Sequence, residues 1–438
     1  MTRKWNWDED LYKGRLRSVI TGMGIVCSIG DNLSEFSAAI KSGKCGINFE
    51  KPNEGLPESL GIAARINNFS FESSLKKIED VKPEFVSRAR SFARRASKSL
   101  QCSVLSLMEA WGNAGLDNCG VSAERMGIVV CGSNLSQNSN FSMYKKFTES
   151  PEYVSPSYSL QFMDTDQVAT ISEIFGICGE SFTVGGASAS GNVGIIKAMQ
   201  MIELGLLDAC IIVGSLWEIS DVERMGFYNL GALGGKDFKG SPEKVCRPFD
   251  KKHDGFIYGE GSACIVLESL KSARKRGRKV LAELAGGAII LDANRLSNPN
   301  EDGEVKVMMT ALERAGVNST EVHYINAHGT STPMGDITEA NAIKRVLGNG
   351  LDRTVVNSTK SMTGHCLFSA GVIEAVATVI QANEGFVHPN TNLDEPIDNR
   401  LRFSTNIFQN AEIDIAMSNS FGFGGINTSI ILKRGVEL

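Results

Sequence analysis

Ser181-Phe-Thr-Val-Gly-Gly-Ala-Ser-Ala-Ser-Gly191 reads as a short strand that runs into a Gly/Ser-rich turn and then into a helix of small residues. A second segment of the same design is Asn357-Ser-Thr-Lys-Ser-Met-Thr-Gly-His-Cys-Leu-Phe-Ser-Ala-Gly371. Small residues at a helix start let backbones approach closely and expose N–H groups toward developing negative charge. Two tightly packed buried helices without any chemistry would show the same pattern. Together the segments favour a duplicated fold whose functional site lies where its halves meet.

Apolar, β-branched runs alternate with helical patterns outward from these segments, over the whole chain of 438 residues. We expect strands at residues 18–20, 126–130, 209–213 and 355–356, and helices at residues 92–114, 193–204, 305–315 and 372–382. No low-complexity tract or long Pro/Ser-rich linker divides the chain, so the two halves should share one interface. The alternation is typical of a layered α/β protein.

Composition excludes several classes of function. A formal net charge of −5 argues against nucleic acid as a partner, because phosphate binding needs a basic surface. No apolar run approaches the roughly 18 residues that a membrane span needs, and residues 1–17 lack the apolar region of a secretion signal. The ten cysteines form no C-x-x-C pair and there are only five histidines, which predicts reduced thiols and no metal site. We therefore expect a cytoplasmic, metal-free protein.

Two histidines stand in contexts that suit hydrogen-bond donation. Asn326-Ala-His-Gly-Thr-Ser-Thr-Pro-Met-Gly-Asp336 follows an apolar strand at residues 323–325 and precedes a helix, so His328 can point an N–H group into a cleft. A satisfied turn histidine is the alternative. His365 lies at a second helix start, where the helix dipole disfavours the imidazolium. Two neutral imidazoles that converge on one carbonyl would stabilise a developing oxyanion.

Two further features flank these histidines. Lys360 lies five residues before His365 and Glu374 nine after it, and their charges could pair behind the site. The alternative is a surface ion pair worth less than about 1 kcal/mol. Ser418-Asn-Ser-Phe-Gly-Phe-Gly-Gly-Ile-Asn427 surrounds two phenylalanines with glycines, which allows close backbone approach to a ligand and movement of an aromatic ring. A hairpin turn that leads into a strand at residues 429–432 is the plainer interpretation.

These segments, together with Arg247-Pro-Phe-Asp-Lys-Lys-His-Asp-Gly-Phe256, resemble the β-ketoacyl-acyl carrier protein synthases of fatty acid and polyketide pathways. The similarity runs from about Ser18 to Lys433. It implies a thiolase-like fold of five αβαβα layers in two similar βαβαβαββ halves, and a homodimer formed through the central sheets. We place the N-terminal half, with Ser188, at residues 17–268. The C-terminal half, with both histidines and the Gly-Phe-Gly-Gly loop, is placed at residues 269–438.

The resemblance also implies roles for individual residues. The family's catalytic set is a cysteine at the start of a buried helix plus two histidines, which match His328 and His365. Lys360 and Glu374 match the supporting pair. The positions that hold the phosphopantetheine arm and the position of the gating phenylalanine match Thr330, Thr332 and Phe423.

The chain departs from the family at the nucleophile. The family reads roughly Thr-Ala-Cys where this sequence reads Gly186-Ala187-Ser188, and Ala189-Ser-Gly191 follows without a gap. Ser188 therefore occupies the cysteine position, and none of the ten cysteines lies within a few residues of it. A helix dipole contributes about 0.3 to 2 kcal/mol, which cannot turn a serine into an alkoxide. Self-acylation should therefore be slow.

Decarboxylation of a malonyl thioester needs no nucleophile, only donors that stabilise the enolate oxygen. This combination resembles the freestanding ketosynthase-like decarboxylases of antibiotic-type polyketide pathways, which supply acetyl-carrier protein for β-branching. We therefore predict conversion of malonyl- to acetyl-acyl carrier protein, with no tightly bound cofactor and the substrate on the carrier's phosphopantetheine arm. Two alternatives stay open. One is an acyltransferase or slow condensing enzyme that uses Ser188 as nucleophile. The other is a non-catalytic partner subunit like a chain-length factor, although such subunits usually lack the histidine motifs.

Overall fold

The computed structural model describes residues 11–12, 15–236 and 240–435, so most of the stretch predicted to lack a secretion signal lies outside the described residues. Its centre is an 11-stranded sheet of order β14-β12-β11-β16-β17-β10-β3-β9-β8-β6-β7. In the part of the chain that is described, no helix combines the length and the apolar character needed to cross a membrane.

The sheet consists of two halves with the same topology. The N-terminal half contains β3 (Ser18–Cys27), β6 (Met126–Cys131), β7 (Ser181–Val184), β8 (Ala209–Gly214) and β9 (Gly261–Ser269). The C-terminal half contains β10 (Ala282–Leu291), β11 (Tyr324–Asn326), β12 (Val355–Asn357), β16 (Ile415–Gly422) and β17 (Ile426–Arg434). If the five strands of each half are numbered in chain order, they lie side by side in the order one, five, four, two, three. The first two pairings in this order are antiparallel and the last two are parallel. The duplication predicted from the sequence is confirmed.

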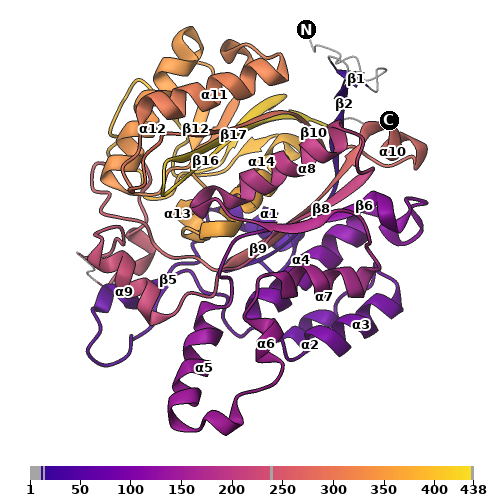
Figure 1. Cartoon of the computed structure of the whole chain (residues 1–438). Coiled ribbons are helices and arrows are strands. Elements are labelled where there is room, and N and C mark those ends of the chain that lie inside the picture. The colour runs from indigo at the N-terminus through magenta and orange to yellow at the C-terminus, as the bar shows by residue number, and fades with distance from the viewer. Residues whose placement is uncertain (1–10, 13–14, 237–239, 436–438) are drawn as a thin grey trace.

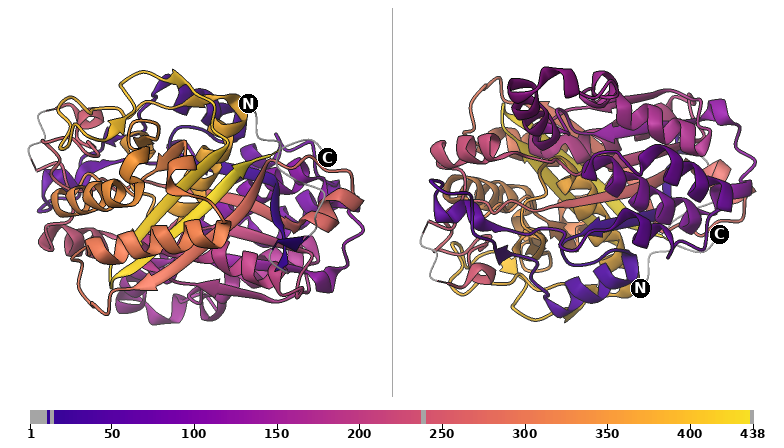
Figure 2. Two further views of the ribbon diagram at one scale, coloured as in Figure 1. Left: turned by 90° about the horizontal axis from the view of Figure 1, so that it is seen from above. Right: turned by 90° about the horizontal axis from the view of Figure 1, so that it is seen from below.

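Helices complete five layers around this sheet (Figures 1 and 2). The central layer is formed by α8 (Ser190–Glu203) and α14 (Ala370–Glu384), which lie between the two halves of the sheet. The N-terminal half is covered on its outer face by α3 (Pro83–Ala93), α4 (Lys98–Ala114) and α7 (Thr165–Phe175). The C-terminal half is covered by α11 (Glu301–Ala315) and α12 (Pro333–Leu347). α14 is buried on all sides from Ala370 to Ala382 and is mostly apolar, with Glu374, Thr378 and Gln381 as buried polar exceptions.

Close backbone contact joins the starts of the two central helices. A Cβ atom on Gly191 would lie 2.7 Å from the backbone nitrogen of Val372, and one on Gly371 would lie 2.8 Å from that of Asn192. Any larger residue would force the helices apart. These two glycines therefore bring together the turns that precede α8 and α14, which belong to different halves of the chain.

The further α-helices and strands are mostly short. They are α1 (Leu33–Ser42), α2 (Phe71–Leu75), α5 (Gln137–Glu149), α6 (Tyr158–Gln161), α9 (Asp221–Asn229), α10 (Leu270–Lys275), α13 (Lys360–Thr363), the edge strand β14 (Arg402–Phe403), and three two-stranded sheets, β1 (Leu11–Tyr12) with β2 (Arg15–Leu16), β4 (Asn48–Phe49) with β5 (Ile62–Ala63), and β13 (Phe386–Val387) with β15 (Gln409–Asn410).

One predicted helix is divided in the structure, so its predicted bounds are wrong. The helix expected at residues 92–114 is two helices, because α3 ends at Ala93 and α4 begins only at Lys98. Ser97 is the N-cap of α4 and its hydroxyl accepts a hydrogen bond from the N–H of Leu100. Such a cap stabilises a helix start by typically about 1 kcal/mol. The other predicted strands and helices are present, with ends shifted by a few residues, except that the strand predicted at residues 18–20 extends to Cys27.

Candidate active site

A cavity of about 570 Å³ opens where the two halves meet, and side chains from both halves line it. Its walls are largely apolar and include six aromatic side chains, those of Trp217, Phe227, Phe256, Phe368, Phe421 and Phe423. Among the lining residues that the structure describes there is no cysteine, lysine or arginine. The polar groups in it therefore act in a largely apolar space, where electrostatic interactions are stronger than in water.

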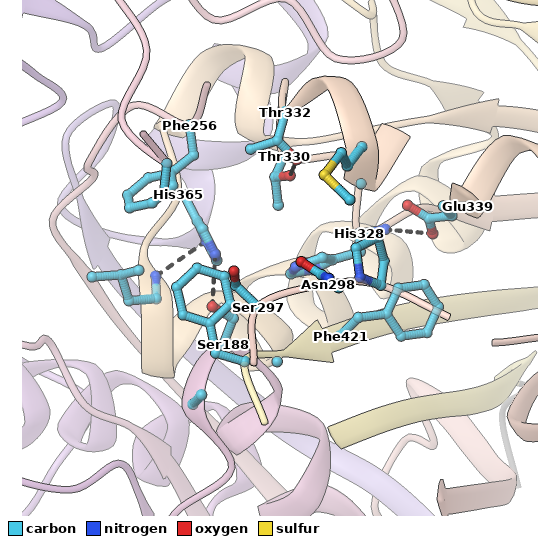
Figure 3. Close-up of a pocket in the computed structure, with 18 of the residues that line it drawn as sticks. Ser188, Phe256, Ser297, Asn298, His328, Thr330, Thr332, Glu339, His365 and Phe421 are labelled. Atoms are coloured by element: carbon cyan, nitrogen blue, oxygen red, sulfur yellow. Dashed lines mark hydrogen bonds between the residues drawn. The ribbon is translucent and has the colours of Figure 1, made fainter. Parts of the chain in front are cut away.

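Ser188 lies in the turn just before α8, and its side chain lines the cavity (Figure 3). The preceding residue, Ala187, has φ +48°, a left-handed conformation that is uncommon outside glycine. The turn is tied by the N–H of Gly186, which donates to Ser190 Oγ at 2.8 Å. A Cβ atom on Gly422 would lie 2.5 Å from the Gly186 carbonyl oxygen, so β16 packs directly on this turn. Nothing in the packing requires glycine at position 185.

His365 occupies the equivalent turn before α14 and faces Ser188. Its Nε2 lies 2.9 Å from Ser188 Oγ, and the N–H of Leu367 donates to its Nδ1 at 3.3 Å (Figure 3). A neutral imidazole whose Nδ1 accepts a hydrogen bond carries its proton on Nε2. His365 therefore donates to the serine oxygen. In this tautomer it cannot remove the serine proton.

His328 follows β11 and presents a second donor to the same cavity. Lys360 Nζ donates to the His328 carbonyl oxygen at 2.6 Å and lies 3.4 Å from its Nδ1. This contact again leaves the imidazole proton on Nε2. The rings of His328 and His365 have centroids 5.3 Å apart and an interplanar angle of 82°. The two N–H groups thus belong to adjacent, nearly perpendicular rings.

Burial and charge keep both imidazoles neutral. Burial is the largest cause that lowers the pKa of each histidine well below its usual range, and the positive charge of Lys360 adds to it. Lys360 is itself paired with Glu374, and both side chains are buried. The alternative interpretation of Lys360 and Glu374 as a surface ion pair is therefore wrong. Burial raises the pKa of Glu374 to about 7, and the lysine charge opposes that rise.

Glu339 and Asp336 hold the His328 loop and were not singled out from the sequence. Glu339 accepts the N–H groups of His328 at 2.8 Å and Gly329 at 2.7 Å. Asp336 accepts the N–H of Ser331, in the loop after His328, at 3.1 Å and that of Phe249 at 2.7 Å, and lies 2.9 Å from Nδ1 of His253. The two carboxylates lie one helical turn apart on α12, with Asp336 as the last residue of the quoted motif and Glu339 three residues after it. That spacing was the available signal.

The remaining candidate residues also line the cavity. The hydroxyls of Thr330 and Thr332 lie 2.8 Å apart, on the loop between His328 and α12. Phe423 lies in the hairpin between β16 and β17, is 40% exposed, and has its ring centroid 6.4 Å from that of Phe227. The next residues, Gly424 and Gly425, have positive φ angles of 84° and 71°, which explains why this turn is glycine-rich. The segment at residues 418–427 therefore both forms a hairpin turn between β16 and β17 and lines the cavity.

This arrangement suits a reaction in which negative charge develops on a carbonyl oxygen. Two neutral N–H donors, each oriented by a contact at its other ring nitrogen, open into an apolar cavity. Such donors need no reorganisation when the charge appears, which is the main source of transition-state stabilisation by an oxyanion hole. The cavity offers Ser188 where the family has a thiol.

Sequence comparison identifies relatives along almost the whole chain. Residues 17–273 match the beta-ketoacyl synthase N-terminal domain, and residues 281–394 match the beta-ketoacyl synthase C-terminal domain. The polyketide biosynthesis malonyl-ACP decarboxylase PksF of Bacillus subtilis is 37% identical over 416 residues, which covers 95% of this chain and 96% of that protein. A 3-oxoacyl-[acyl-carrier-protein] synthase 2 of Coxiella burnetii is 33% identical over 426 residues, covering 95% and 98%.

Solved structures show the same fold. A beta-ketoacyl synthase from Burkholderia phymatum superposes with a TM-score of 0.84 at 29% identity, covering 95% of this chain and 99% of the other. The ketosynthase of a type II polyketide system, solved in complex with its acyl-carrier protein, gives a TM-score of 0.83 at 26% identity and covers 96% and 100%. The five-layered, thiolase-like fold predicted from the sequence is confirmed.

Proposed function

The chain belongs to the beta-ketoacyl synthase family, and from that premise we propose that it is the enzyme that converts malonyl- to acetyl-acyl carrier protein in polyketide biosynthesis. The relative named as a malonyl-ACP decarboxylase covers nearly the whole chain at 37% identity. We further propose that the acetyl group is destined for β-branching of a polyketide. The single observation that carries the proposal is a pair of neutral histidine donors in a cavity whose described lining contains no thiol.

The reaction follows from those two donors. When the bond between C2 and the carboxylate of the malonyl thioester breaks, its electron pair moves into the enolate and carbon dioxide leaves. The enolate oxygen then carries negative charge, which the Nε2–H groups of His328 and His365 can bind. Removal of one such donor typically costs about 2.7 to 4 kcal/mol of transition-state stabilisation. The donors act on the oxygen only, so the step does not depend on an acylated side chain.

The surroundings of the leaving carboxylate support the same reaction. No lysine or arginine is present among the described residues that line the cavity, so no ion pair would hold the malonyl carboxylate there. A desolvated carboxylate is high in free energy, whereas carbon dioxide is neutral. An aromatic cavity therefore favours the product of decarboxylation over the bound malonyl group.

Acylation of Ser188 is the second candidate, and the 2.9 Å contact with His365 is the observation in its favour. A serine nucleophile needs a base that takes its proton. The N–H of Leu367 at Nδ1 instead leaves His365 as a donor toward Ser188. A thioester oxygen that replaced the serine oxygen as acceptor would receive the same N–H. The contact therefore supports decarboxylation more than acyl transfer.

A non-catalytic role, like that of a chain-length factor, is the third candidate. Burying an ion pair such as that of Lys360 and Glu374 costs desolvation free energy. A non-catalytic role offers no reason for this cost. The retained histidines and their buried support favour an active enzyme.

We propose that the substrate arrives on the phosphopantetheine arm of an acyl carrier protein, past Thr330 and Thr332, with Phe423 as a gate. No tightly bound cofactor is needed for the steps above. A cytoplasmic location stays a prediction. A related ketosynthase is known in complex with its acyl-carrier protein, which supports a carrier protein as the partner.

We also propose a homodimer. β7 is the last strand of the 11-stranded sheet and pairs only with β6 among the described strands, so its outer edge can pair with a second copy. The segment around α5 and α6 projects from the same half (Figure 1) and exposes large apolar side chains, Tyr144, Phe147, Tyr153, Leu160 and Phe162. Sedimentation equilibrium of the purified protein tests this: twice the chain mass supports the dimer, and the chain mass alone contradicts it.

Release of carbon dioxide tests the proposed reaction. Carrier protein loaded with carboxyl-labelled malonyl is mixed with the enzyme, and labelled carbon dioxide is trapped over time. We expect release at a rate proportional to enzyme concentration. Carrier incubated without enzyme is the control, and release no faster than in that control would contradict the proposal.

A further inference from the structure

Glu304 is a buried carboxyl group that the mechanism so far leaves unused. It lies in the first turn of α11 and lines the cavity together with Ser188 and His328. Its side chain shares the buried helix face with Met308 and Ala311 and is 1% exposed. Within the described ranges its Oε2 has no hydrogen-bond partner. A buried polar atom without a hydrogen-bond partner lowers the stability of the fold by about 1 to 3 kcal/mol. This cost suggests that Glu304 has a function in the cavity.

The groups around Glu304 favour its protonated form. The neighbouring carboxylates are Glu339, which binds the His328 loop, Asp292, which also lines the cavity, and Glu301 at the surface. The pKa of Glu304 is raised well above its usual range. Burial is the largest cause, and the negative charges of the neighbouring carboxylates add to it. Both effects favour the protonated form of Glu304, in which the carboxyl group can donate its proton.

The proposed reaction requires such a donor. Without an acylated side chain, the enolate has no carbon electrophile and must take a proton at C2. His328 and His365 direct their N–H groups to the oxygen, and a neutral imidazole is a very weak acid. On this ground, and resting on the proposed decarboxylase function, we infer that Glu304 delivers the proton that turns the enolate carbon into the acetyl methyl group.

The step balances. Loss of carbon dioxide leaves the enolate CH2=C(O⁻)–S–. The carboxyl O–H bond of Glu304 breaks as a C–H bond forms at C2, the enolate electron pair forms that bond, and the carbonyl is restored. Glu304 is left as a carboxylate and regains a proton from water. The overall reaction consumes one proton and uses no oxidant or reductant.

The other acids in the cavity are either more fully hydrogen-bonded or less buried than Glu304. Glu339 accepts two backbone N–H groups, and the side-chain amide of Asn419 lies 3.3 Å from it. Asp292 accepts a hydrogen bond from Asn427 at 2.8 Å through Oδ1, whereas its Oδ2 has no partner among the described residues, and the residue as a whole is only partly buried. Glu304 combines full burial with an oxygen that no described group binds. Asp292 is the competitor that an experiment has to separate from it.

Hydrogen exchange separates proton transfer from oxyanion stabilisation. By microscopic reversibility, the group that protonates the enolate also removes a proton from the acetyl methyl group. Wild-type enzyme in D2O should therefore introduce up to three deuterium atoms into acetyl-carrier protein, measured by intact mass. Both exchange and decarboxylation pass through the same enolate and need both histidines. Only exchange needs the acid–base group as well.

The isosteric variant Glu304→Gln should lose exchange by about 10² to 10⁴-fold, the usual contribution of a positioned acid or base, while decarboxylation falls less than about tenfold because water can protonate the enolate. Retained decarboxylation also shows that the variant is folded. If Glu304→Gln is insoluble, Glu304→Ala provides the same test, because removing an unpartnered polar group is well tolerated. Glu301→Gln is the matched control, since it removes a surface carboxylate from the same helix turn. Among the neighbouring carboxylates its charge contributes least to the raised pKa of Glu304, so exchange should fall far less than in Glu304→Gln and decarboxylation should be unchanged.

Each other outcome has a distinct meaning. Absence of decarboxylation by wild type would overturn the proposed function itself. Decarboxylation with no exchange in wild type, or exchange by Glu304→Gln at the wild-type rate, would overturn only the role of Glu304. Loss of exchange in Asp292→Asn but not in Glu304→Gln would assign the proton to Asp292 and refute our inference.

Discussion

Replacing Lys360 with methionine removes the positive charge behind both histidines. The ammonium group pairs with Glu374, donates to the carbonyl of His328 at 2.6 Å and lies 3.4 Å from its Nδ1. All of these groups are buried. Breaking a buried ion pair by removing one partner costs about 3 to 5 kcal/mol. We expect Lys360→Met to lose that much free energy of unfolding.

The rate should fall for a different reason. Without the contact at Nδ1, the His328 ring is free to turn and to place its proton on either nitrogen. Loss of a whole oxyanion donor costs about 10² to 10³-fold, so loss of its orientation should slow decarboxylation toward the lower limit, about 10²-fold. The double variant Lys360→Met/Glu374→Leu removes both charges and should regain most of the stability. It should not regain the rate.

Urea unfolding and carbon dioxide release from malonyl-carrier protein, measured on the same preparations, test this separation. A double variant that recovers the wild-type rate together with its stability would refute the reasoning, because Lys360 would then act on folding alone. A single variant as stable as wild type would show that the buried pair contributes nothing to stability.

Three further predictions concern single side chains. Decarboxylation assays on His328→Ala and His365→Ala should each show a loss of about two to three orders of magnitude, and the double variant should lose less than the product; near wild-type single variants would remove these histidines from the mechanism. Intact-mass spectra with acyl-thioester donors should show no adduct on Ser188→Ala, which keeps most decarboxylation, and an acyl adduct on Ser188→Cys, where the helix start favours a thiolate; an inactive Ser188→Ala would contradict this. Burial lowers the pKa of His388 to about 4, below the value of about 6.5 in an unfolded chain. The unfolded state alone therefore binds a proton between these values, and wild type should lose about 2 to 4 kcal/mol of stability relative to His388→Gln between pH 7 and pH 4; a pH-independent difference would show that His388 is not held neutral.

The duplicated fold could be predicted because its cause is local. Gly191 and Gly371 each sit at the start of a central helix, and both are needed for the close approach of the two turns. The same two motifs predicted Ser188 and His365, the segment at residues 326–336 predicted His328, and the structure brings these three side chains to one cavity. Their roles in catalysis stay predictions.

The rest depends on tertiary contacts that leave little trace in the sequence. Glu304 stands among acidic residues in the first turn of α11, where carboxylates normally serve the helix dipole at the surface. Only its four-residue spacing from Met308, on the buried face, sets it apart. The break between α3 and α4 contains no glycine or proline, so Ser97 was the one local signal. Of the aromatic side chains that line the cavity, Phe256, Phe368, Phe421 and Phe423 belong to segments quoted from the sequence, whereas Trp217 and Phe227 come from parts of the chain without a recognisable motif.

Intact mass spectrometry of both proteins in one reaction tests the central claim most directly. Purified wild-type enzyme is mixed with malonyl-loaded acyl carrier protein, and the masses of carrier and enzyme are followed together. The account predicts that the carrier changes from malonyl to acetyl while the enzyme keeps its unmodified mass throughout. A carrier that stays malonylated over hours, or an acyl adduct on Ser188 that forms and decays at the rate of turnover, would contradict it.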